Sequence, residues 1–240
     1  MSGADHLPKR RQGGQPRPPE ELPRQRRGIT PQLHGRYPDF DVLEQADHWD
    51  EVTRRAVLRR VGEPPRIRFF SPAEAATLAA FCDCVLAQDY EPRVPVLPYV
   101  DEKLFCGRLD GYQYAELPDD RETWQLVARG LDEAAQARGF AGYASADAGV
   151  RADICGRFAR GALEGGVWER LPPARAFSVV MRAVLAAFYS HPWAWNEIGF
   201  GGPAYPRGYA RLGIGQREGY EGDEAVHIDP VTDVAERGLE

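Results

Sequence analysis

The sequence predicts an all-α fold: an irregular bundle of about five helices joined by long loops rich in Pro, Gly and aromatic residues. Apolar residues recur at helical spacing in several segments, and no segment alternates apolar and polar residues as a half-exposed strand does. Hydrophobic residues make up 43% of the 240-residue chain. That fraction is close to the globular norm, so most of the chain should fold around a core.

The ends of the chain differ in composition from its middle. Residues 1–33 are rich in Pro, Arg, Gln and Gly and hold almost no large apolar side chains. Such a segment buries too little surface to offset its ordering entropy, so we expect a disordered basic tail. It is either a solvated tail or an arm that contacts an acidic partner or an anionic surface. Residues 34–222 should form the helical domain, and residues 223–240 a flexible C-terminal tail.

The first helices are indicated by capping residues and prolines. Residues 47–61 are charged and periodic, and Pro64-Pro65 end that segment. Ser71 can cap the next helix, Pro72 suits its first position, and Glu74 completes a capping box. The apolar face of this second helix consists of Ala75, Leu78, Ala79, Cys82, Val85 and Leu86.

Prolines and glycines divide the middle of the chain. Three prolines in residues 91–98 predict an extended connection. A short helix over residues 99–109 and a tyrosine-rich loop over residues 111–118 should follow. Asp119 or Asp120 then caps a helix that ends near Gly139. Its apolar face consists of Trp124, Val127, Ala128, Leu131 and Ala135.

The last two predicted helices lie before and after a pair of glycines. One should run over about residues 145–163 and end before Gly165-Gly166. Pro172-Pro173 open the helix with the strongest apolar stripe, and Pro192 ends it. The stripe should face the core, and it consists of Phe177, Val180, Met181, Val184, Leu185 and Phe188.

Net charge and hydropathy exclude two classes of protein. A net charge of −6 argues against a general nucleic-acid binder, which is normally basic. No stretch approaches the roughly 20 apolar residues that a membrane span needs. Arg10-Arg11 and Arg26-Arg27 are not followed by an apolar segment, so neither pair forms a usable export signal. The chain is therefore expected to be cytoplasmic.

The four cysteines do not match a metal motif. Cys82, Cys84, Cys106 and Cys155 have neither the paired C-x-x-C spacing of zinc sites nor a ferredoxin-type spacing. Cys82 and Cys84 are two residues apart, so on a helix they point to different faces. We interpret the cysteines as small buried side chains, with a shared cluster or a structural disulfide as the alternative.

Residues 191–209, which read H-P-W-A-W-N-E-I-G-F-G-G-P-A-Y-P-R-G-Y, are unlike an ordinary linker. Long loops without secondary structure are uncommon and tend to be functional. Trp, Tyr and Arg are frequent hot-spot residues of interfaces, and proline lowers the entropy cost of ordering a loop. The segment therefore suits docking against another protein, although it could also pack on its own helices as a clasp. The predicted contact residues are Trp193, Trp195, Asn196, Glu197, Phe200, Tyr205, Arg207 and Tyr209, with Arg108 and Tyr112 of the 108–114 loop as a second element.

Cofactor and catalytic motifs are missing from the sequence. No G-x-G-x-x-G follows a strand, and no phosphate-binding G-x-x-x-x-G-K-[ST] is present. His191 and Glu197 are the one neighbouring pair suited to acid–base or metal chemistry, but six residues separate them and zinc generally takes more protein ligands. We expect no metal, with His191 capping the preceding helix through its carbonyls and Glu197 pairing with Arg207 or Arg211.

Two alternatives to a docking subunit stay open. One is a stand-alone enzyme or metal site centred on His191, Asn196, Glu197 and Tyr205. The other is a general scaffold or chaperone that binds several clients through the same segment. A single dominant partner bound stoichiometrically would separate the docking subunit from both.

Three segments of the chain resemble the gluconate 2-dehydrogenase subunit 3 family. They are residues 191–209, residues 104–114 (L-F-C-G-R-L-D-G-Y-Q-Y) and residues 69–74 (F-F-S-P-A-E). The resemblance runs from about residue 37 to residue 221. It implies a non-catalytic small subunit that binds, stabilises and helps to mature or export a larger subunit. That partner would be an FAD-containing oxidoreductase of the glucose-methanol-choline type, acting on a sugar, sugar acid or alcohol.

The resemblance also bears on the cofactor and the compartment. FAD is expected in the partner subunit and no cofactor in this chain, and a cytochrome subunit often accepts the electrons in such complexes. Many relatives carry a twin-arginine signal with an apolar segment, whereas this chain has a basic, Pro-rich segment instead. A periplasmic location is therefore expected only if the chain is exported with its partner.

Overall fold

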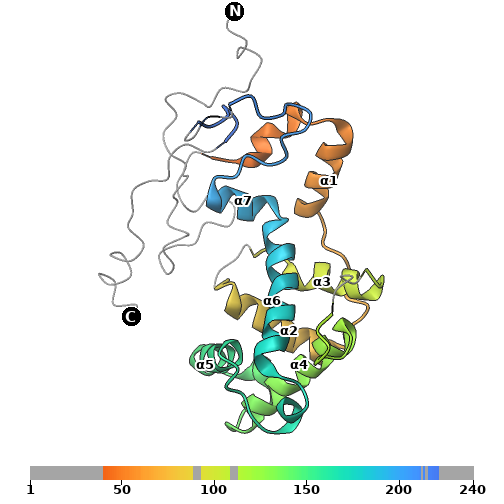
Figure 1. The fold of residues 1–240 in the computed structure, drawn as a ribbon, viewed down its shortest axis with the longest axis vertical. Coiled ribbons are helices and arrows are strands. Elements are labelled where there is room, and N and C mark those ends of the chain that lie inside the picture. Colours follow the sequence, from red (N-terminus) through yellow and green to blue (C-terminus); the bar gives the residue numbers. More distant parts are fainter. Residues whose placement is uncertain (1–39, 89–92, 109–112, 212, 214–215, 222–240) are drawn as a thin grey trace, which may run out of the picture. The chain divides into compact units, whose positions relative to one another are not determined.

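A computed structural model describes residues 40–88, 93–108, 113–211, 213 and 216–221. The predicted all-α class is confirmed, because the described residues contain seven α-helices, three short 3₁₀ helices and no strand (Figure 1). They divide into two compact units. Unit 1 comprises the described residues within 40–63, 93–94 and 189–221, and unit 2 comprises those within 64–88 and 95–188. The predicted tails, residues 1–33 and 223–240, lie outside the described residues.

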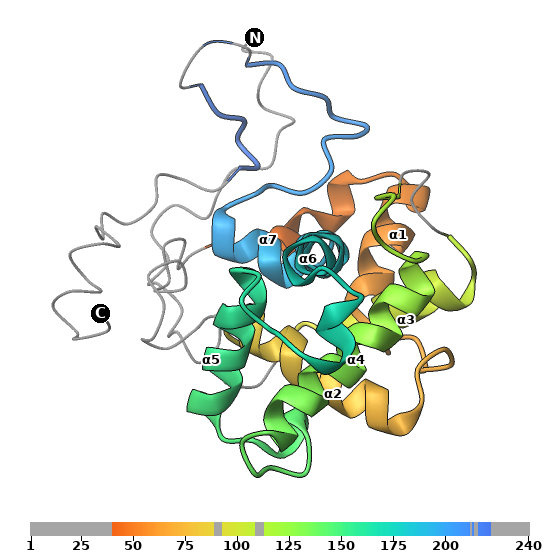
Figure 2. The same cartoon turned by 60° about the horizontal axis from the view of Figure 1, so that its bottom comes forward.

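Unit 2 is a helical bundle, and Figure 2 shows α6 nearly end-on with α3, α4 and α5 around it. Helix α2 packs against α3, α4 and α5. The centre of the unit contains fully buried side chains from several elements, among them Leu78, Phe81, Trp124, Leu131 and Phe158. The bounds of its helices are α2 Pro72–Val85, α3 Val96–Phe105, α4 Asp120–Gln136, α5 Ala148–Ala159 and α6 Pro173–Tyr189, the last residue of which belongs to unit 1.

The helix starts of unit 2 follow the capping residues in the sequence. The Ser71 Oγ accepts a hydrogen bond from the Glu74 N–H at 3.4 Å, and the Glu74 Oε2 accepts one from the Ser71 N–H at 2.9 Å. The predicted capping box is therefore confirmed. Asp119 caps α4 and Asp147 caps α5, each through its Oδ1. These local interactions explain why residue type alone located the starts of α2 and α4.

Two predicted helices of unit 2 differ clearly from the structure in their bounds. Helix α3 begins at Val96, before the predicted residue 99, because Pro98 lies in the first turn, where its missing N–H would have no helical acceptor. The predicted 145–163 helix is instead a 3₁₀ helix, Tyr143–Ser145, followed by α5. Helix α5 ends before Gly161, whose φ of +70° suits a helix terminus, so the predicted end near residue 163 was too late.

The buried face of α6 is narrower than its apolar stripe. Val180, Val184 and Phe188 are buried as predicted, whereas Leu185 is 39% exposed. Buried Ala176 and Ala187 complete the face, because they continue the spacing of three and four residues. The small size of alanine left these two positions out of the predicted stripe.

A buried carboxylate fixes the connection that leads into α2. Asp101 of α3 has no exposed surface, and its carboxylate accepts hydrogen bonds from three consecutive backbone N–H groups. The donors are Arg68 at 2.7 Å, Phe69 at 2.9 Å and Phe70 at 3.0 Å. A buried carboxylate needs such partners, because desolvation otherwise costs several kcal/mol. Asp101 therefore holds the irregular 68–70 segment against α3.

Unit 1 is built from three helical segments and a long loop. A 3₁₀ helix, Val42–His48, precedes α1, Glu51–Val61, so the predicted 47–61 helix is divided where Asp50 caps α1. The core of the unit contains Phe40, Val42, Trp49 and Val57. Helix α7, Pro192–Ile198, contacts both other helical segments.

Helix α7 corrects the prediction that residues 191–209 lack secondary structure. Pro192 does end the preceding helix, but it also occupies the first position of a new one. Proline is well suited to that position, because its fixed φ is helical and its missing N–H needs no partner. No helix in the described residues is long and apolar enough to cross a bilayer.

We predict that Asp101→Ala lowers the free energy of unfolding by about 3 kcal/mol or more, since it leaves three buried or half-buried N–H donors without their acceptor. Urea unfolding followed by circular dichroism measures the change. Glu164→Ala is the matched control, because Glu164 is an exposed carboxylate of the same unit and its loss should cost under about 0.5 kcal/mol. A loss below about 1 kcal/mol in Asp101→Ala would contradict the assigned role of this carboxylate.

Candidate functional site

Asn196 anchors α7 to the start of unit 1. Its side chain is 1% exposed, and its Oδ1 accepts a hydrogen bond from the Val42 N–H at 2.8 Å. Its Nδ2 donates to the Asp41 Oδ1 at 3.2 Å, and the same oxygen accepts from the Leu43 N–H. Asn196 therefore joins segments that lie more than 150 residues apart in the chain. Sequence reasoning placed Asn196 among the docking residues, but its burial and its partners make it an internal anchor.

Trp195 and His191 also hold α7 in place. The Trp195 ring packs on the Phe40–Val57 core, and its Nε1 donates to the Tyr189 carbonyl at 2.6 Å. His191 is 1% exposed, and its Nδ1 accepts from the Trp193 N–H at 3.2 Å. His191 thus caps the start of α7, and its predicted capping of the end of the preceding helix stays a prediction. The two rings of His191 and Trp193 also meet edge to face at 4.9 Å.

Gly202 lets the loop after α7 approach the core of unit 1. It is buried and has a φ of +74°, a conformation that L side chains rarely adopt. A Cβ at this position would lie 2.9 Å from the Val42 Cγ2 and 3.0 Å from the Trp49 Cζ2. The glycine is therefore required both by backbone conformation and by space. This contact brings the loop onto the same core that Asn196 anchors.

Arg207 fixes the loop further along. Its Nη1 donates to the Gln45 Oε1 at 3.0 Å, and its Nη2 donates to the Pro203 carbonyl at 3.3 Å. The guanidinium lies over the Tyr220 ring, 3.7 Å from its centroid, a favourable cation–π arrangement. Burial is the main reason that the pKa of Arg207 is lowered, and the neighbouring Tyr220 and Tyr209 oppose that shift. Arg207 therefore serves mainly to hold the loop rather than to offer a free charge.

Tyr220 closes the loop from the C-terminal side. Its hydroxyl donates to the Gly208 carbonyl at 2.9 Å, and the residue is 1% exposed. Burial raises the pKa of Tyr220 to about 12, so this hydroxyl stays protonated and remains a donor at physiological pH. Partial burial and the nearby Glu221 carboxylate raise the pKa of Tyr209 as well.

Glu218 is a second buried acceptor for this loop. It is 3% exposed, and its Oε1 accepts hydrogen bonds from the backbone N–H groups of Ala210 and Arg211, the latter at 2.6 Å. Its Oε2 has no hydrogen-bond partner among the described residues. Sequence reasoning missed Glu218 and Tyr220, because a charged R-E-G-Y-E stretch near the end of a domain has no pattern that indicates burial.

Aromatic and apolar side chains remain exposed around this well-anchored backbone. Tyr205 is 65% exposed, Tyr209 49% and Phe200 39%. Ile198, at the end of α7, is 48% exposed and was not among the predicted docking residues. We call these four side chains the aromatic surface of unit 1. Trp193 and Trp195 are only half-buried, and the side chain of Glu197 lies outside the described part, so its predicted pairing with Arg207 or Arg211 stays a prediction.

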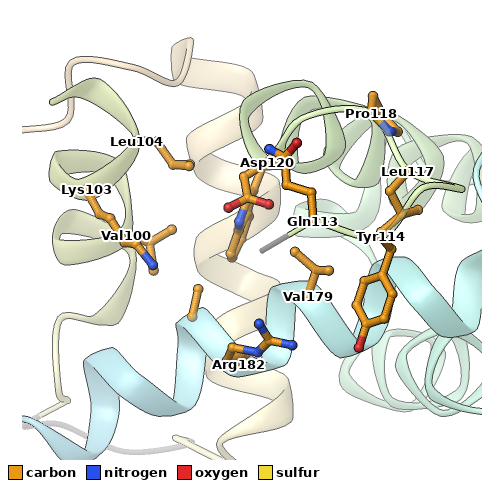
Figure 3. A pocket seen from close by; sticks show the side chains of 12 residues that line it. Val100, Lys103, Leu104, Gln113, Tyr114, Leu117, Pro118, Asp120, Val179 and Arg182 are labelled. Atoms are coloured by element: carbon orange, nitrogen blue, oxygen red, sulfur yellow. The ribbon is translucent and has the colours of Figure 1, made fainter. Parts of the chain in front are cut away.

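The predicted second docking element belongs to unit 2. Arg108 is exposed, whereas Tyr112 lies outside the described residues. The described residues after it line a small cavity with α3, α4 and α6, which Figure 3 shows with Lys103, Tyr114, Asp120 and Arg182 around it. The cavity volume is about 20 Å³, enough for roughly one water molecule and far below the size of a flavin or sugar.

The described residues do not form a metal site around His191. No three His, Cys, Asp or Glu side chains gather as a metal site in the part of the chain that the structure describes. His191 uses its Nδ1 to cap α7, and its ring is buried. The arrangement is suited to holding a loop in place, and the chemistry it offers to solvent is that of the exposed Tyr and Phe side chains.

Two glycines of the loop provide a matched test of its packing. Gly202 and Gly208 both have positive φ, but a Cβ at Gly208 would meet no atom within 4 Å. We predict that Gly208→Ala costs about 1 kcal/mol of stability from backbone strain alone. Gly202→Ala should cost about 1–3 kcal/mol more, because the methyl group would collide with Val42 and Trp49. Thermal and urea unfolding of both variants measure the difference, and equal losses would show that the loop does not pack as described.

Comparison with known proteins agrees with the resemblance seen in the sequence. Residues 72–202 match the family model of gluconate 2-dehydrogenase subunit 3. The matched range covers just over half of the chain and is narrower than the range of 37–221 expected from the resemblance. No curated protein and no solved structure matches the chain significantly. The matched range includes the bundle of unit 2, helix α7 with its Asn196 anchor, and Gly202. By this match, the chain belongs to the gluconate 2-dehydrogenase subunit 3 family.

Proposed function

We propose that this protein is a non-catalytic small subunit that binds and stabilises the FAD-containing subunit of a dehydrogenase for sugars, sugar acids or alcohols. The family to which the chain belongs is that of subunit 3 of gluconate 2-dehydrogenase. The observation that carries the proposal is the aromatic surface of unit 1, where Tyr205, Tyr209 and Phe200 project from a loop whose backbone is held at many points. Solvent-exposed tyrosines on a fixed backbone lose little entropy when they bind another protein.

The anchoring of the loop supports docking more strongly than the composition of the loop alone. A mobile loop would have to be ordered on binding, at a cost that weakens the complex. Here Asn196, Arg207 and Glu218 already hold the backbone through buried or half-buried hydrogen bonds. The clasp and the docking surface are therefore two roles of one segment: internal side chains fix it, and outward side chains are free to bind.

The flavin is proposed to reside in the partner subunit. This chain has no G-x-G-x-x-G dinucleotide motif after a strand, which supports placing the flavin in another subunit. A cytochrome subunit would be a further partner in the same complex. The protein's own compartment then follows from that of its partner, cytoplasmic if the complex stays in the cell and periplasmic if the complex is exported. Nothing in the geometry of His191 favours a separate enzymatic function.

The proposal predicts one stoichiometric, flavin-containing partner. The tagged full-length chain should co-purify from its host with a larger polypeptide, and the eluate should absorb near about 450 nm because of the bound flavin. Many clients in variable amounts would instead favour a general scaffold or chaperone. A colourless eluate that contains this chain alone would contradict the proposal.

We predict that Tyr205→Ala weakens binding of that partner by about 2 kcal/mol, roughly a thirtyfold rise in Kd, as for an interface hot spot. Val52→Ala is the matched control, because Val52 is 64% exposed against 65% for Tyr205 and lies in the same unit. Calorimetric or interferometric titration measures Kd, and thermal unfolding checks that both variants are folded. Trp195→Ala would not serve here, since it also removes core packing. Equal Kd values for Tyr205→Ala and Val52→Ala would place the interface elsewhere.

A further inference from the structure

Two cysteines of unit 2 face each other across a pair of packed helices. The Phe81 ring of α2 and the Phe158 ring of α5 lie 5.8 Å apart, and Cα atoms of the two helices approach within 8 Å. Cys84 lies three residues after Phe81, and Cys155 lies three residues before Phe158. Residues three apart share a helix face, so each cysteine lies about one helical turn from one of the two packed rings, on neighbouring helices.

Independent contacts place both thiols at the same point. The Tyr143 hydroxyl donates to the Arg151 carbonyl at 3.1 Å, one turn before Cys155 on α5. Tyr143 is fully buried, and both Cys84 and Cys155 lie near enough to affect it electrostatically. The Cys155 thiol also lies close enough to the Cys84 side chain to interact with it electrostatically and by hydrogen bonding. Both thiols are in the reduced form and partly accessible.

From this placement we propose that Cys84 and Cys155 are a disulfide site, which links α2 to α5 when a disulfide-containing oxidant reaches them. Neither of the other cysteines is suited to the reaction. Cys82 is buried and points to a different face of α2 from Cys84. Cys106 is exposed, just after the end of α3. The proposal is independent of the partner-binding function.

The reaction is thiol–disulfide exchange with an external disulfide, such as oxidised glutathione or a disulfide oxidase. One cysteine of the pair, as thiolate, attacks the oxidant, whose S–S bond breaks and releases one thiolate. The second cysteine attacks the resulting mixed disulfide, which forms the Cys84–Cys155 bond and releases the second thiolate. Two electrons pass to the oxidant, and the two protons of the cysteine thiols end on its two released sulfur atoms.

The surroundings of the pair set the speed of this reaction. The hydrogen bond with Cys84, together with burial, raises the pKa of the Cys155 thiol. Because the thiolate is the attacking species, closure should be slow at neutral pH and faster under alkaline conditions. The pair therefore suits a stabilising cross-link formed during or after assembly rather than a rapid sensor of oxidants.

In the test, the protein is incubated with oxidised glutathione at about pH 8.5. It is then denatured in the presence of N-ethylmaleimide, which alkylates the remaining thiols, and its digest is mapped by mass spectrometry. We expect a cross-linked peptide that contains Cys84 and Cys155, with a mass about 2 Da below the sum of its reduced halves. Cys106 serves as an internal control, because as an exposed thiol it should acquire glutathione and so prove that the oxidant was active.

Variants and unfolding measurements complete the test. Cys106→Ser should retain the cross-link, and Cys84→Ser should lose it. The oxidised wild-type protein should unfold at a higher Tm than the reduced one, and dithiothreitol should reverse the gain. If Cys106 carries glutathione while Cys84 and Cys155 remain alkylated thiols, or if either pairs with Cys82 or Cys106 instead, the proposal is overturned.

Discussion

The candidate site depends on the hydrogen bonds of the buried Asn196 side chain. One amide both accepts from the Val42 N–H and donates to Asp41, so it joins α7 to a segment from the other end of the domain. The amide is almost completely removed from water, and a buried amide is stable only when its donors and acceptors are paired. Because α7 is held there, Gly202 and the loop that follows reach the core of unit 1, and the aromatic surface has a defined position.

The same physical solution recurs in both units at several irregular segments. Asp101 binds three successive N–H groups ahead of α2, and Glu218 binds two N–H groups of the 210–211 segment. Asp132 accepts from both the Thr77 hydroxyl and the Tyr143 N–H. Irregular backbone lacks the internal hydrogen bonds of a helix, so its donors need side-chain acceptors when they are buried. Acidic side chains held on or near helices supply these acceptors, which allows a small helical protein to hold long loops in one conformation.

The inward and outward side chains of the loop have different roles, which bears on function. Side chains that point inward, such as Asn196 and Arg207, fix the loop, and side chains that point outward, such as Tyr205 and Tyr209, are left exposed. Exposed aromatic residues are otherwise a solubility burden, so their concentration on one anchored loop is consistent with a partner surface. Unit 2 contributes stability through its helical core, and the Cys84–Cys155 pair is the point at which that core could be reinforced covalently.

The sequence by itself determined the helical class, the starts of α2 and α4 and the family, because caps, prolines, apolar spacing and the 191–209 motif are local signals. It also located the segment whose aromatic side chains are exposed. Only the tertiary structure decided that Asn196 is an anchor, that Pro192 begins α7, and that Glu218 and Tyr220 close the loop. Burial is the physical reason for this difference. Whether a polar or aromatic side chain faces solvent or another segment depends on contacts between residues far apart in the chain, and no local pattern encodes those contacts.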